Sequence, residues 1–473
     1  MSLDFLFQPS SIALVGITTA NPDHWTRTFL NSLIEFGFDG QLYLVNPKGG
    51  EINGYPVYPS IQDIPGSIDY AISLAPAAMG PSLVEESAKK GVLAIHFCTA
   101  GFSELGNKEG ARLERDLSEI ARKTCVRIVG PNCMGIYCPR SRMSFSPSFS
   151  KESGSVGFIS QSGGNAIHLV RQATTRGIRF SKVVSYGNAC DLNESDFLEY
   201  LADDADTEII TLYIEGIKDG RRFRQALEQA CQKKRVILLK AGVSHGGTRA
   251  AASHTSSLSG NDSVWDALCK QTGAIRVSSL IEMVDVLVTL QFLSAPRGKK
   301  TLLIGGGGGA SVLITDEFEK HGFEIPQLPQ ELIAKIREFT PEAGNIFHNP
   351  VDYSQAIMYP DKLNRTIDIV SRWEGIDLLV MFIRTGQWAQ QTDAIGHPSL
   401  VLSGFLNEAI PITKPVAIVL EPSVLPQESK GIYNALQDCA AARLPVYYTF
   451  AGAANAINLV MSDNRGQPDI TGR

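Results

Sequence analysis

The chain has 473 residues, of which 44% are apolar and 19% charged, and its formal net charge is −6. That length exceeds one ordinary hydrophobic core and predicts about three domains, at roughly 150 residues each. The acidic balance, without a dense run of Lys or Arg, argues against a surface for nucleic acid or an acidic membrane. No run of about 18 apolar residues occurs and the first residues carry no basic segment, so we expect a cytoplasmic protein.

Eight cysteines are scattered along the chain, with no C-x-x-C pair and no companion histidines at the spacing of metal ligands. We therefore expect no metal site. Several of them, such as Cys98, lie in apolar runs and are interpreted as small core residues.

Short apolar runs alternate with amphipathic stretches from Ile12 onward, which is typical of βαβ units. The runs are continuous rather than alternating, so they predict strands covered on both faces in a parallel, doubly wound sheet. In the first series the predicted strands are Ile12–Gly16, Gln41–Asn46, Asp69–Ala75, Val92–Thr99 and Val126–Gly130.

Two interruptions divide the rest of the chain. The Ser- and Pro-rich passage 138–153 predicts a linker, and a polar turn at 295–298 predicts a second joint. The predicted domains are 1–140, 152–294 and 298–465, and the segment 326–373 of the last is expected to be irregular. The later predicted elements are strands 155–160, 181–185, 209–215 and 236–241, helix 280–293, and strands 300–304, 376–383, 415–421 and 446–450.

The first predicted strand is followed by Gly16, Ile17 and Thr18, at the strand end where open α/β sheets bind ligands. A dinucleotide fingerprint needs three glycines at G-x-G-x-x-G spacing, and only Gly16 is present. The second strand runs into Lys48 instead of the acidic residue that NAD enzymes use for the ribose. This favours a phosphate-bearing nucleotide such as CoA over NAD, with a solvated loop lysine as the alternative interpretation of Lys48.

Three segments at predicted strand ends, residues 45–48, 100–104 (Ala-Gly-Phe-Ser-Glu) and 130–135 (Gly-Pro-Asn-Cys-Met-Gly), resemble the CoA-domain signatures of the NDP-forming acyl-CoA synthetases, relatives of the succinyl-CoA synthetases. The resemblance implies an α/β protein with a Rossmann-like CoA-binding domain followed by two flavodoxin-like domains of the succinyl-CoA synthetase type. One segment departs from the family: residues 21–27 replace its Pro-x-Lys-x-Gly-like loop, so either Arg27 supplies the lost charge or CoA affinity is reduced. The implied CoA-binding residues are Gly16, Ile17, Thr18, Lys48, Ala100, Gly101, Asn132 and Cys133.

Residues 249–260 (Arg-Ala-Ala-Ala-Ser-His-Thr-Ser-Ser-Leu-Ser-Gly) resemble the phosphohistidine segment of the same family. The resemblance implies that His254 is catalytic, and an imidazole with an ordinary pKa near ~6.5 is nucleophilic at neutral pH. Ser256 stands where the family usually has Gly. Glu215, at the end of a predicted strand, resembles the carboxylate that supports this histidine, while the alternative is an exposed strand-end residue.

Two glycine loops each join a predicted strand to a predicted helix. Backbone N–H groups and the helix dipole suit such loops to phosphate, although ordinary turns are the alternative interpretation. Neither is a Walker A loop. Residues 349–352 (Asn-Pro-Val-Asp) also resemble a family signature, but no role is assigned to Asp352. The candidate phosphate-binding residues are Ser160, Gln161, Ser162, Gly163 and Gly164 in the first loop and Gly306, Gly307 and Gly308 in the second.

The resemblance implies an acid–CoA ligase that converts acyl-CoA, phosphate and ADP to acid, CoA and ATP through an acyl phosphate and a phosphohistidine at His254. No ATP-grasp segment is recognisable, so a separate ATP-grasp β subunit is implied, binding ATP or ADP with Mg²⁺ in a hetero-oligomer such as α2β2. A catalytically idle protein that binds CoA or senses acyl-CoA is the alternative. The identity of the acid and the choice between ADP and GDP stay open.

Overall fold

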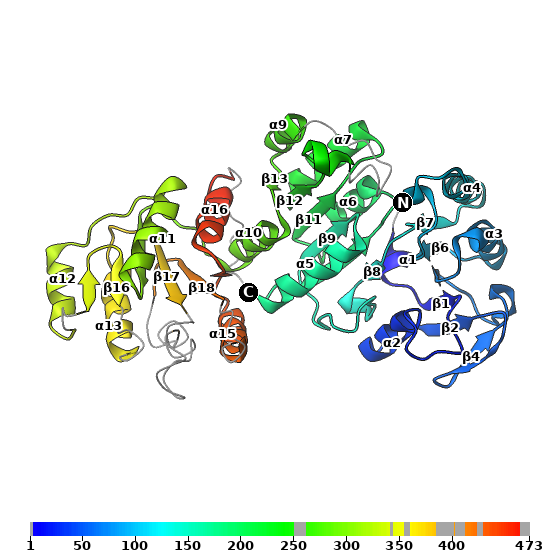
Figure 1. Ribbon diagram of the computed structural model, residues 1–473, viewed down its shortest axis with the longest axis horizontal. Coiled ribbons are helices and arrows are strands. Elements are labelled where there is room, and N and C mark those ends of the chain that lie inside the picture. The colour runs from blue at the N-terminus through cyan, green and yellow to red at the C-terminus, as the bar shows by residue number, and fades with distance from the viewer. Residues whose placement is uncertain are drawn as a thin grey trace. The chain divides into compact units, whose positions relative to one another are not determined.

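The computed structural model describes residues 3–249, 262–340, 344–353, 360–384, 402, 412–422 and 429–463. The chain forms two compact units: Met1–Thr174 with Arg179–Met283, and Thr175–Ile178 with Val284–Arg473. The first unit holds two β-sheets and the second holds one (Figure 1). The three sheets confirm the expected series of three α/β domains, whereas the boundaries at 140, 152, 294 and 298 stay predictions.

The first sheet has the strand order β3-β4-β2-β1-β5-β6-β7, in which every neighbouring pair is parallel except β3 with β4. Without β3 this is the Rossmann order, which reverses between β1 and β5. Its strands are β1 (Ser11–Val15), β2 (Gln41–Val45), β3 (Gly50–Ile52), β4 (Tyr55–Tyr58), β5 (Tyr70–Ser73), β6 (Ala94–Phe97) and β7 (Arg127–Val129), and its helices are α1 (Asp4–Phe7), α2 (Arg27–Phe36), α3 (Gly80–Lys90) and α4 (Lys108–Thr124).

The second sheet has the order β13-β12-β11-β9-β10-β8, and all its pairs are parallel except β10 with β8. The five parallel strands follow the flavodoxin order, which reverses between β9 and β11. The strands are β8 (Gly135–Tyr137), β9 (Val156–Ser160), β10 (Phe180–Ser185), β11 (Ile209–Ile214), β12 (Arg235–Lys240) and β13 (Ile275–Val277), and the helices are α5 (Gly163–Thr175), α6 (Glu194–Asp203), α7 (Gly220–Lys233), α9 (Asp262–Thr272) and α10 (Leu280–Phe292).

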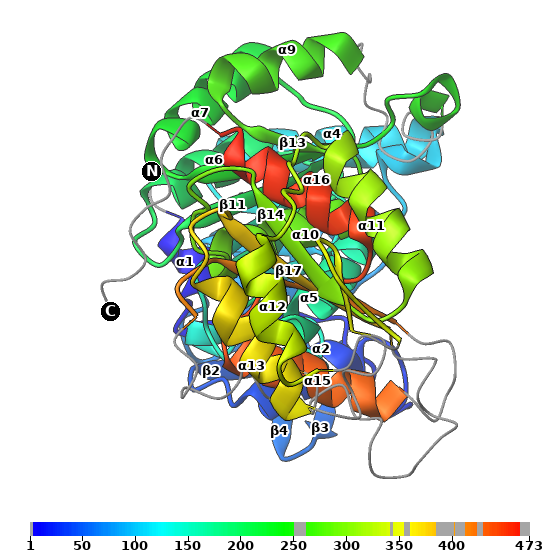
Figure 2. The ribbon, with the colours of Figure 1, turned by 90° about the vertical axis from the view of Figure 1, so that its left-hand side faces the viewer.

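The third sheet repeats the flavodoxin order, as β15-β16-β14-β17-β18-β19 with only β15 antiparallel. Helix α11 packs beside α16 on one face of this sheet (Figure 2). The strands are β14 (Thr301–Gly305), β15 (Asn345–Phe347), β16 (Val351–Tyr353), β17 (Leu378–Arg384), β18 (Val416–Glu421) and β19 (Val446–Tyr447), and the helices are α11 (Gly308–Lys320), α12 (Gln330–Arg337), α13 (Pro360–Ser371), α15 (Ser429–Ala441) and α16 (Phe450–Met461).

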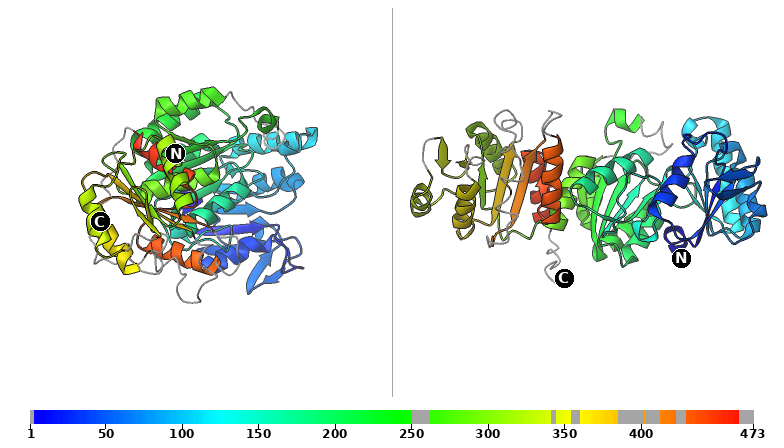
Figure 3. Two further views of the ribbon diagram at one scale, coloured as in Figure 1. Left: turned by 60° about the vertical axis from the view of Figure 1, so that its left-hand side comes forward. Right: turned by 90° about the horizontal axis from the view of Figure 1, so that it is seen from below.

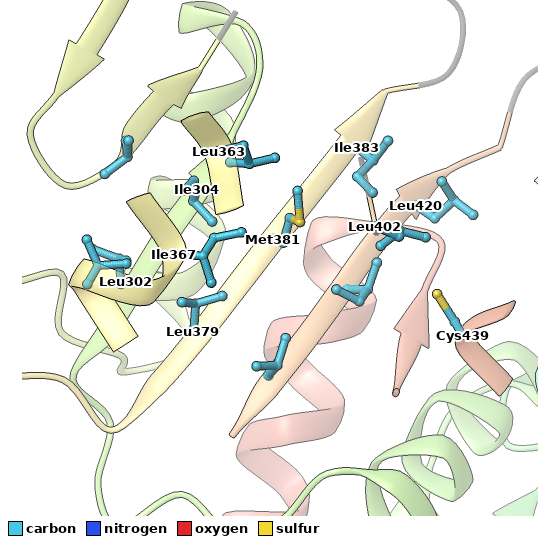
Figure 4. Close-up of a cluster of buried hydrophobic side chains, with 14 of the residues drawn as sticks. Leu302, Ile304, Leu363, Ile367, Leu379, Met381, Ile383, Leu402, Leu420 and Cys439 are labelled. Carbon is cyan, nitrogen blue, oxygen red and sulfur yellow. The ribbon is translucent and has the colours of Figure 1, made fainter. Parts of the chain in front are cut away.

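Both faces of each sheet are covered by helices, which explains the continuous apolar runs of the strands (Figure 3). In the third sheet, alternate residues of β17, including Leu379 and Met381, point into one buried cluster with Leu363 of α13 and Cys439 of α15 (Figure 4). The intervening Phe382 packs on the other face, where its ring contacts Phe450 of α16. The central strands are therefore apolar at most positions, although their side chains still alternate between two cores.

Two sequence expectations need correction. The passage 138–153 is not a bare linker, because Phe145 and Phe149 within it are buried and their rings pack together. The segment 326–373 is not irregular throughout, since it contains α12 and α13. Among the described residues, no helix has both the length and the apolar character needed to cross a bilayer.

His96 of β6 lies completely buried in the first sheet. Its Nε2 lies 3.0 Å from the carbonyl oxygen of Cys133, and its ring stacks on Tyr70. Burial lowers the pKa of His96 to about 4, although the hydrogen bond to Cys133 acts in the opposite direction. The folded chain therefore keeps a neutral imidazole that an unfolded chain would protonate below pH ~6.5.

We expect the free energy of unfolding to fall as the pH is lowered from about 6.5 to about 4, because only the unfolded state binds the His96 proton in that window. The full loss would be about 3 kcal/mol. Urea unfolding at several pH values measures it. His96→Gln, which can still donate to Cys133, should flatten this part of the pH dependence; an unchanged pH dependence in the variant would contradict the assignment.

Candidate functional site

The loops that follow β1 and β2 are tied together by Asn46. Its amide Nδ2 donates to the carbonyl of Ile17 at 2.9 Å, and its Oδ1 accepts from the backbone N–H of Lys48 at 3.0 Å. Gly16 has φ +85°, and a Cβ there would lie 2.7 Å from the backbone nitrogen of Ala75, so only glycine fits. The structure thus brings Gly16, Ile17 and Thr18 next to the start of the Lys48 loop, while Lys48 itself is exposed.

Arg27 does not present an exposed cation that would replace the charge lost from the altered loop. It is only 8% exposed, and its Nε donates to the carbonyl of Thr18 at 2.7 Å. The hydroxyl of Thr26 accepts from the backbone N–H of Thr18 at 3.3 Å. These side chains bind the backbone of their own loop. The expectation that Arg27 supplies the charge lost from this loop is therefore not supported. Lys48 is an exposed cation near these strand ends.

The loop that contains Ala100 and Gly101 is fastened by Glu104 and by a residue that sequence reasoning missed, Asn188. Glu104 accepts from Gly101 N at 2.5 Å and from Phe102 N at 3.0 Å. The Asn188 amide, which is 1% exposed, donates to Glu104 at 2.6 Å and to Glu114 at 2.8 Å. Burial alone would raise the pKa of Glu104, but the hydrogen bonds from Gly101, Asn188 and Phe102 outweigh it and lower the pKa.

Asn132 and Cys133 follow a cis peptide bond between Gly130 and Pro131, and Asn132 has φ +59°. The backbone N–H of Asn188 donates to the carbonyl of Pro131 at 2.9 Å, so the segment after β10 in the second sheet meets the segment after β7 in the first. Asn188 lies just beyond a predicted strand end, and that position was the signal in the sequence that could have identified it.

The first glycine loop lies after β9, at the point where the strand order of the second sheet reverses. Gln161 is 4% exposed, and its Oε1 accepts from the backbone N–H groups of Glu215 and Gly216 at 2.8 and 3.0 Å. Ser160 is fully buried and its hydroxyl donates to the carbonyl of Ser162 at 2.7 Å, so it shapes the loop from within. Helix α5 then begins at Gly163, with its free backbone N–H groups at this loop.

A cavity of about 220 Å³ in the first unit is lined both by residues predicted to bind CoA and by residues of the first glycine loop predicted to bind phosphate. Asn132 and Cys133 line it together with Gln161, Ser162, Gly163 and Gly164. Cys98, interpreted as a core residue from the sequence, also lines it and is only partly buried; burial raises the pKa of this thiol to about 12. Backbone amides, an amide side chain and a helix N-terminus therefore surround a space suited to an anion beside an acyl group.

Glu215 directly follows β11, across the switch point from Gln161, and it is 6% exposed. It is therefore not the exposed strand-end residue of the alternative interpretation. Lys240, at the end of the neighbouring β12, donates from Nζ to the carbonyl of Glu215 at 2.8 Å. Sequence reasoning placed Lys240 inside an apolar strand and missed it as a buried cation. His254 and Ser256 lie outside the described residues.

The second glycine loop lies in the second unit, after β14. Gly307 has φ +103°, and its backbone N–H donates to Asp352 at 2.8 Å. Asp352 is 5% exposed, so a carboxylate already occupies the N-terminus of α11, and Gly306 and Gly308 flank it. Asn349 ties the same motif to β14, since its Oδ1 accepts from Leu303 N at 3.0 Å. The 349–352 signature thus builds this loop, which the sequence did not reveal.

Asn188→Ala should lower the free energy of unfolding of the first unit by about 2–4 kcal/mol, because it removes hydrogen bonds to two carboxylates and leaves them facing each other. Chemical denaturation measures this loss. Adding Glu114→Gln should restore part of it by removing one charge. A double variant no more stable than Asn188→Ala would show that carboxylate repulsion contributes nothing.

Within the described part of the chain, no group of three or more His, Cys, Asp or Glu side chains is arranged to hold a metal ion.

Comparison with known proteins assigns the two domains of the first unit. Residues 10–139 match the model of a CoA binding domain, and residues 153–290 match the model of a succinyl-CoA ligase like flavodoxin domain. The chain resembles the solved structure of the dinucleotide forming acetyl-coenzyme A synthetase 1 of Ca. Korarchaeum cryptofilum, in complex with phosphate and ADP, with a TM-score of 0.80 and 29% identity over 98% of this chain and 97% of that one.

The chain is 40% identical to the alpha subunit of acetate–CoA ligase [ADP-forming] I from Pyrococcus furiosus, over 74% of this chain and 76% of that subunit. It is 37% identical to acetate–CoA ligase [ADP-forming] I from Archaeoglobus fulgidus, over 80% of this chain but only 55% of that longer protein. Together with the domain matches and the shared fold, these likenesses confirm the resemblance read from the sequence: the chain belongs to the family of ADP-forming acyl-CoA synthetases.

Proposed function

We propose that this chain is the CoA-binding, phosphohistidine-bearing subunit of an ADP-forming acyl-CoA synthetase, which interconverts acyl-CoA, phosphate and ADP with acid, CoA and ATP. The observation that carries the proposal is the 220 Å³ cavity, in which Asn132 and Cys133 of the CoA-domain signature face the first glycine loop. Cleavage of a thioester by phosphate requires these two binding sites to adjoin, because the attacking oxygen and the acyl carbon must be held within contact distance.

In the first step, a phosphate held at the N-terminus of α5 attacks the acyl carbon, an oxygen–carbon bond forms, and the carbon–sulfur bond breaks to release CoA. The backbone N–H groups at Gly163 and Gly164 and the amide of Gln161 stabilise the anion. In the second step, one ring nitrogen of His254 attacks phosphorus and the carboxylate of the acid leaves. Glu215 accepts a hydrogen bond from the other ring nitrogen and balances the positive charge that develops on the ring.

In the third step, the phosphoryl group passes from His254 to ADP on a second module. We propose that this module is an ATP-grasp β subunit, in a hetero-oligomer such as α2β2, and that Mg²⁺ binds there to offset the charge of the nucleotide phosphates. The name of the Pyrococcus relative as an alpha subunit supports a divided enzyme.

Lys48→Ala should weaken CoA binding about two- to fivefold, as expected for one exposed contact between a cation and a phosphate. Isothermal titration with CoA at low ionic strength measures the change, which should shrink as salt is added. Lys123→Ala is the matched control, because this exposed lysine lies in the last turn of α4. Equal effects of the two substitutions would contradict a specific role for Lys48.

His254→Ala should abolish incorporation of inorganic phosphate into the chain, measured as acid-labile, base-stable radiolabel with a panel of acetyl-, succinyl-, branched-chain and aryl-acyl-CoA. The unmodified chain should be labelled by at least one member of the panel, and that member identifies the acid. The reaction should run without nucleotide, since the first two steps need only acyl-CoA and phosphate.

Absence of label with every acyl-CoA, with and without an ATP-grasp subunit, would overturn the proposal. If the chain still bound CoA, that result would favour the idle CoA-binding protein. Label that persists in His254→Ala would place the phosphoryl group on another residue.

A further inference from the structure

Glu215 is held by contacts that the proposed reaction does not itself require. The hydroxyl of Tyr213, in β11, donates to Oε1 of Glu215 at 3.2 Å. Glu215 lies two residues further along the chain, directly after the end of this strand. Both side chains are largely buried, with exposed fractions of 9% for Tyr213 and 6% for Glu215. A strand places residues i and i+2 on the same face, so the phenol lies over the carboxylate that follows it.

The contact continues into the helix that begins at the first glycine loop. The side chain of Asn165, in the first turn of α5, lies beside the Tyr213 hydroxyl and acts on that phenol in the direction that lowers its pKa. Asn165 is itself fixed, because its backbone N–H donates to the hydroxyl of Ser162 at 3.3 Å. The amide of Asn165, the phenol and the carboxylate therefore follow one another from the start of α5 to Glu215.

The phenol acts only as a donor to Glu215. Burial, followed by the negative charge of Glu215, raises the pKa of Tyr213 above its ordinary value, so the hydroxyl keeps its proton. A carboxylate accepts hydrogen bonds through its oxygens, so the phenol fixes the direction in which Oε1 of Glu215 points. Tyr213 thus acts on the orientation of Glu215.

Other charged groups also face this carboxylate. Lys240 of β12 adjoins it as a cation, although burial lowers the pKa of Lys240. The buried Tyr186, after β10, lies near both Glu215 and Glu194 of α6. Lys218 acts against the burial that raises the pKa of Glu194. Arg276 and Asp262 act on Lys240 with opposite signs. Within the described part of the chain, Tyr213 donates a hydrogen bond to the Glu215 carboxylate itself.

We propose that Tyr213 is a positioning residue, which holds the Glu215 carboxylate in the one orientation that the phosphohistidine step uses. The inference rests on the proposed function, because Glu215 has this task only if His254 carries the phosphoryl group. Asn165 acts on Glu215 indirectly, by orienting the hydroxyl of Tyr213.

The chain offers a closely matched control. Tyr186 is fully buried, follows β10 and lies near Glu215, but its hydroxyl has no hydrogen-bond partner among the described residues. Tyr213→Phe and Tyr186→Phe therefore each remove a phenol oxygen near Glu215, and only the first removes a hydrogen bond. Thermal unfolding of both variants checks that they fold like the unmodified chain.

The test is the rate of phosphate incorporation as a function of acyl-CoA concentration, with whichever acyl-CoA labels the unmodified chain best. Tyr213→Phe should slow the maximal rate of labelling about tenfold or more, the effect of a lost hydrogen bond to a charged group. The acyl-CoA concentration at half-maximal rate should not change.

Asn165→Ala should slow the maximal rate by less, and the double variant should be no slower than Tyr213→Phe alone, since both residues act through one hydroxyl. Tyr186→Phe should label at the rate of the unmodified chain. The inference is overturned if Tyr213→Phe labels at the unmodified rate, if it changes the half-saturating acyl-CoA concentration instead, or if Tyr186→Phe slows labelling equally. Failure of the unmodified chain to label would instead defeat the proposed function.

Discussion

The arrangement of the first unit depends on one side-chain amide that spans the point where the second sheet reverses its strand order. Gln161 accepts two backbone hydrogen bonds from the chain just after β11 while its own residue follows β9. Strands on either side of a switch point lead into connections on opposite faces of the sheet, so their ends separate and leave a crevice. Because Gln161 bridges that crevice at its base, the glycine loop, the start of α5 and Glu215 keep a fixed relation to one another.

Much of the architecture could be predicted because the long parallel strands are apolar along most of their length. That pattern identified them to within about two residues, from Ser11–Val15 to Val416–Glu421, and it indicated parallel sheets covered on both faces. It missed the three- and four-residue strands β3, β4, β8, β13, β15 and β16, whose runs are too short to have a period. It also failed for 138–153, because the buried Phe145 and Phe149 are separated by polar residues.

The candidate site was predictable where chemistry sits directly after a strand, as with Lys48, Gln161 and Glu215. It was not predictable where a residue acts through a partner distant in sequence. Asn188 contacts Glu104 from 84 positions away, and Asp352 contacts Gly307 from 45 positions away. Each has a side chain that is common in loops, so its role is visible only once the fold brings the partner to it. The buried position of Arg27 is of the same kind, because the sequence left open whether its charge was available to CoA.

One consequence follows from the pairing of β8 with β10. The CoA signature at 130–135 is anchored at one end in β7 of the first sheet and passes at the other end into β8, which is the edge strand of the second. A protein cut near residue 140 would leave β8 with the wrong fragment, and the remaining piece would carry β10 with a bare, apolar edge open to self-association. The segment that joins the two domains is thus also a structural part of both, and neither domain would keep all its strands if the chain were divided within it.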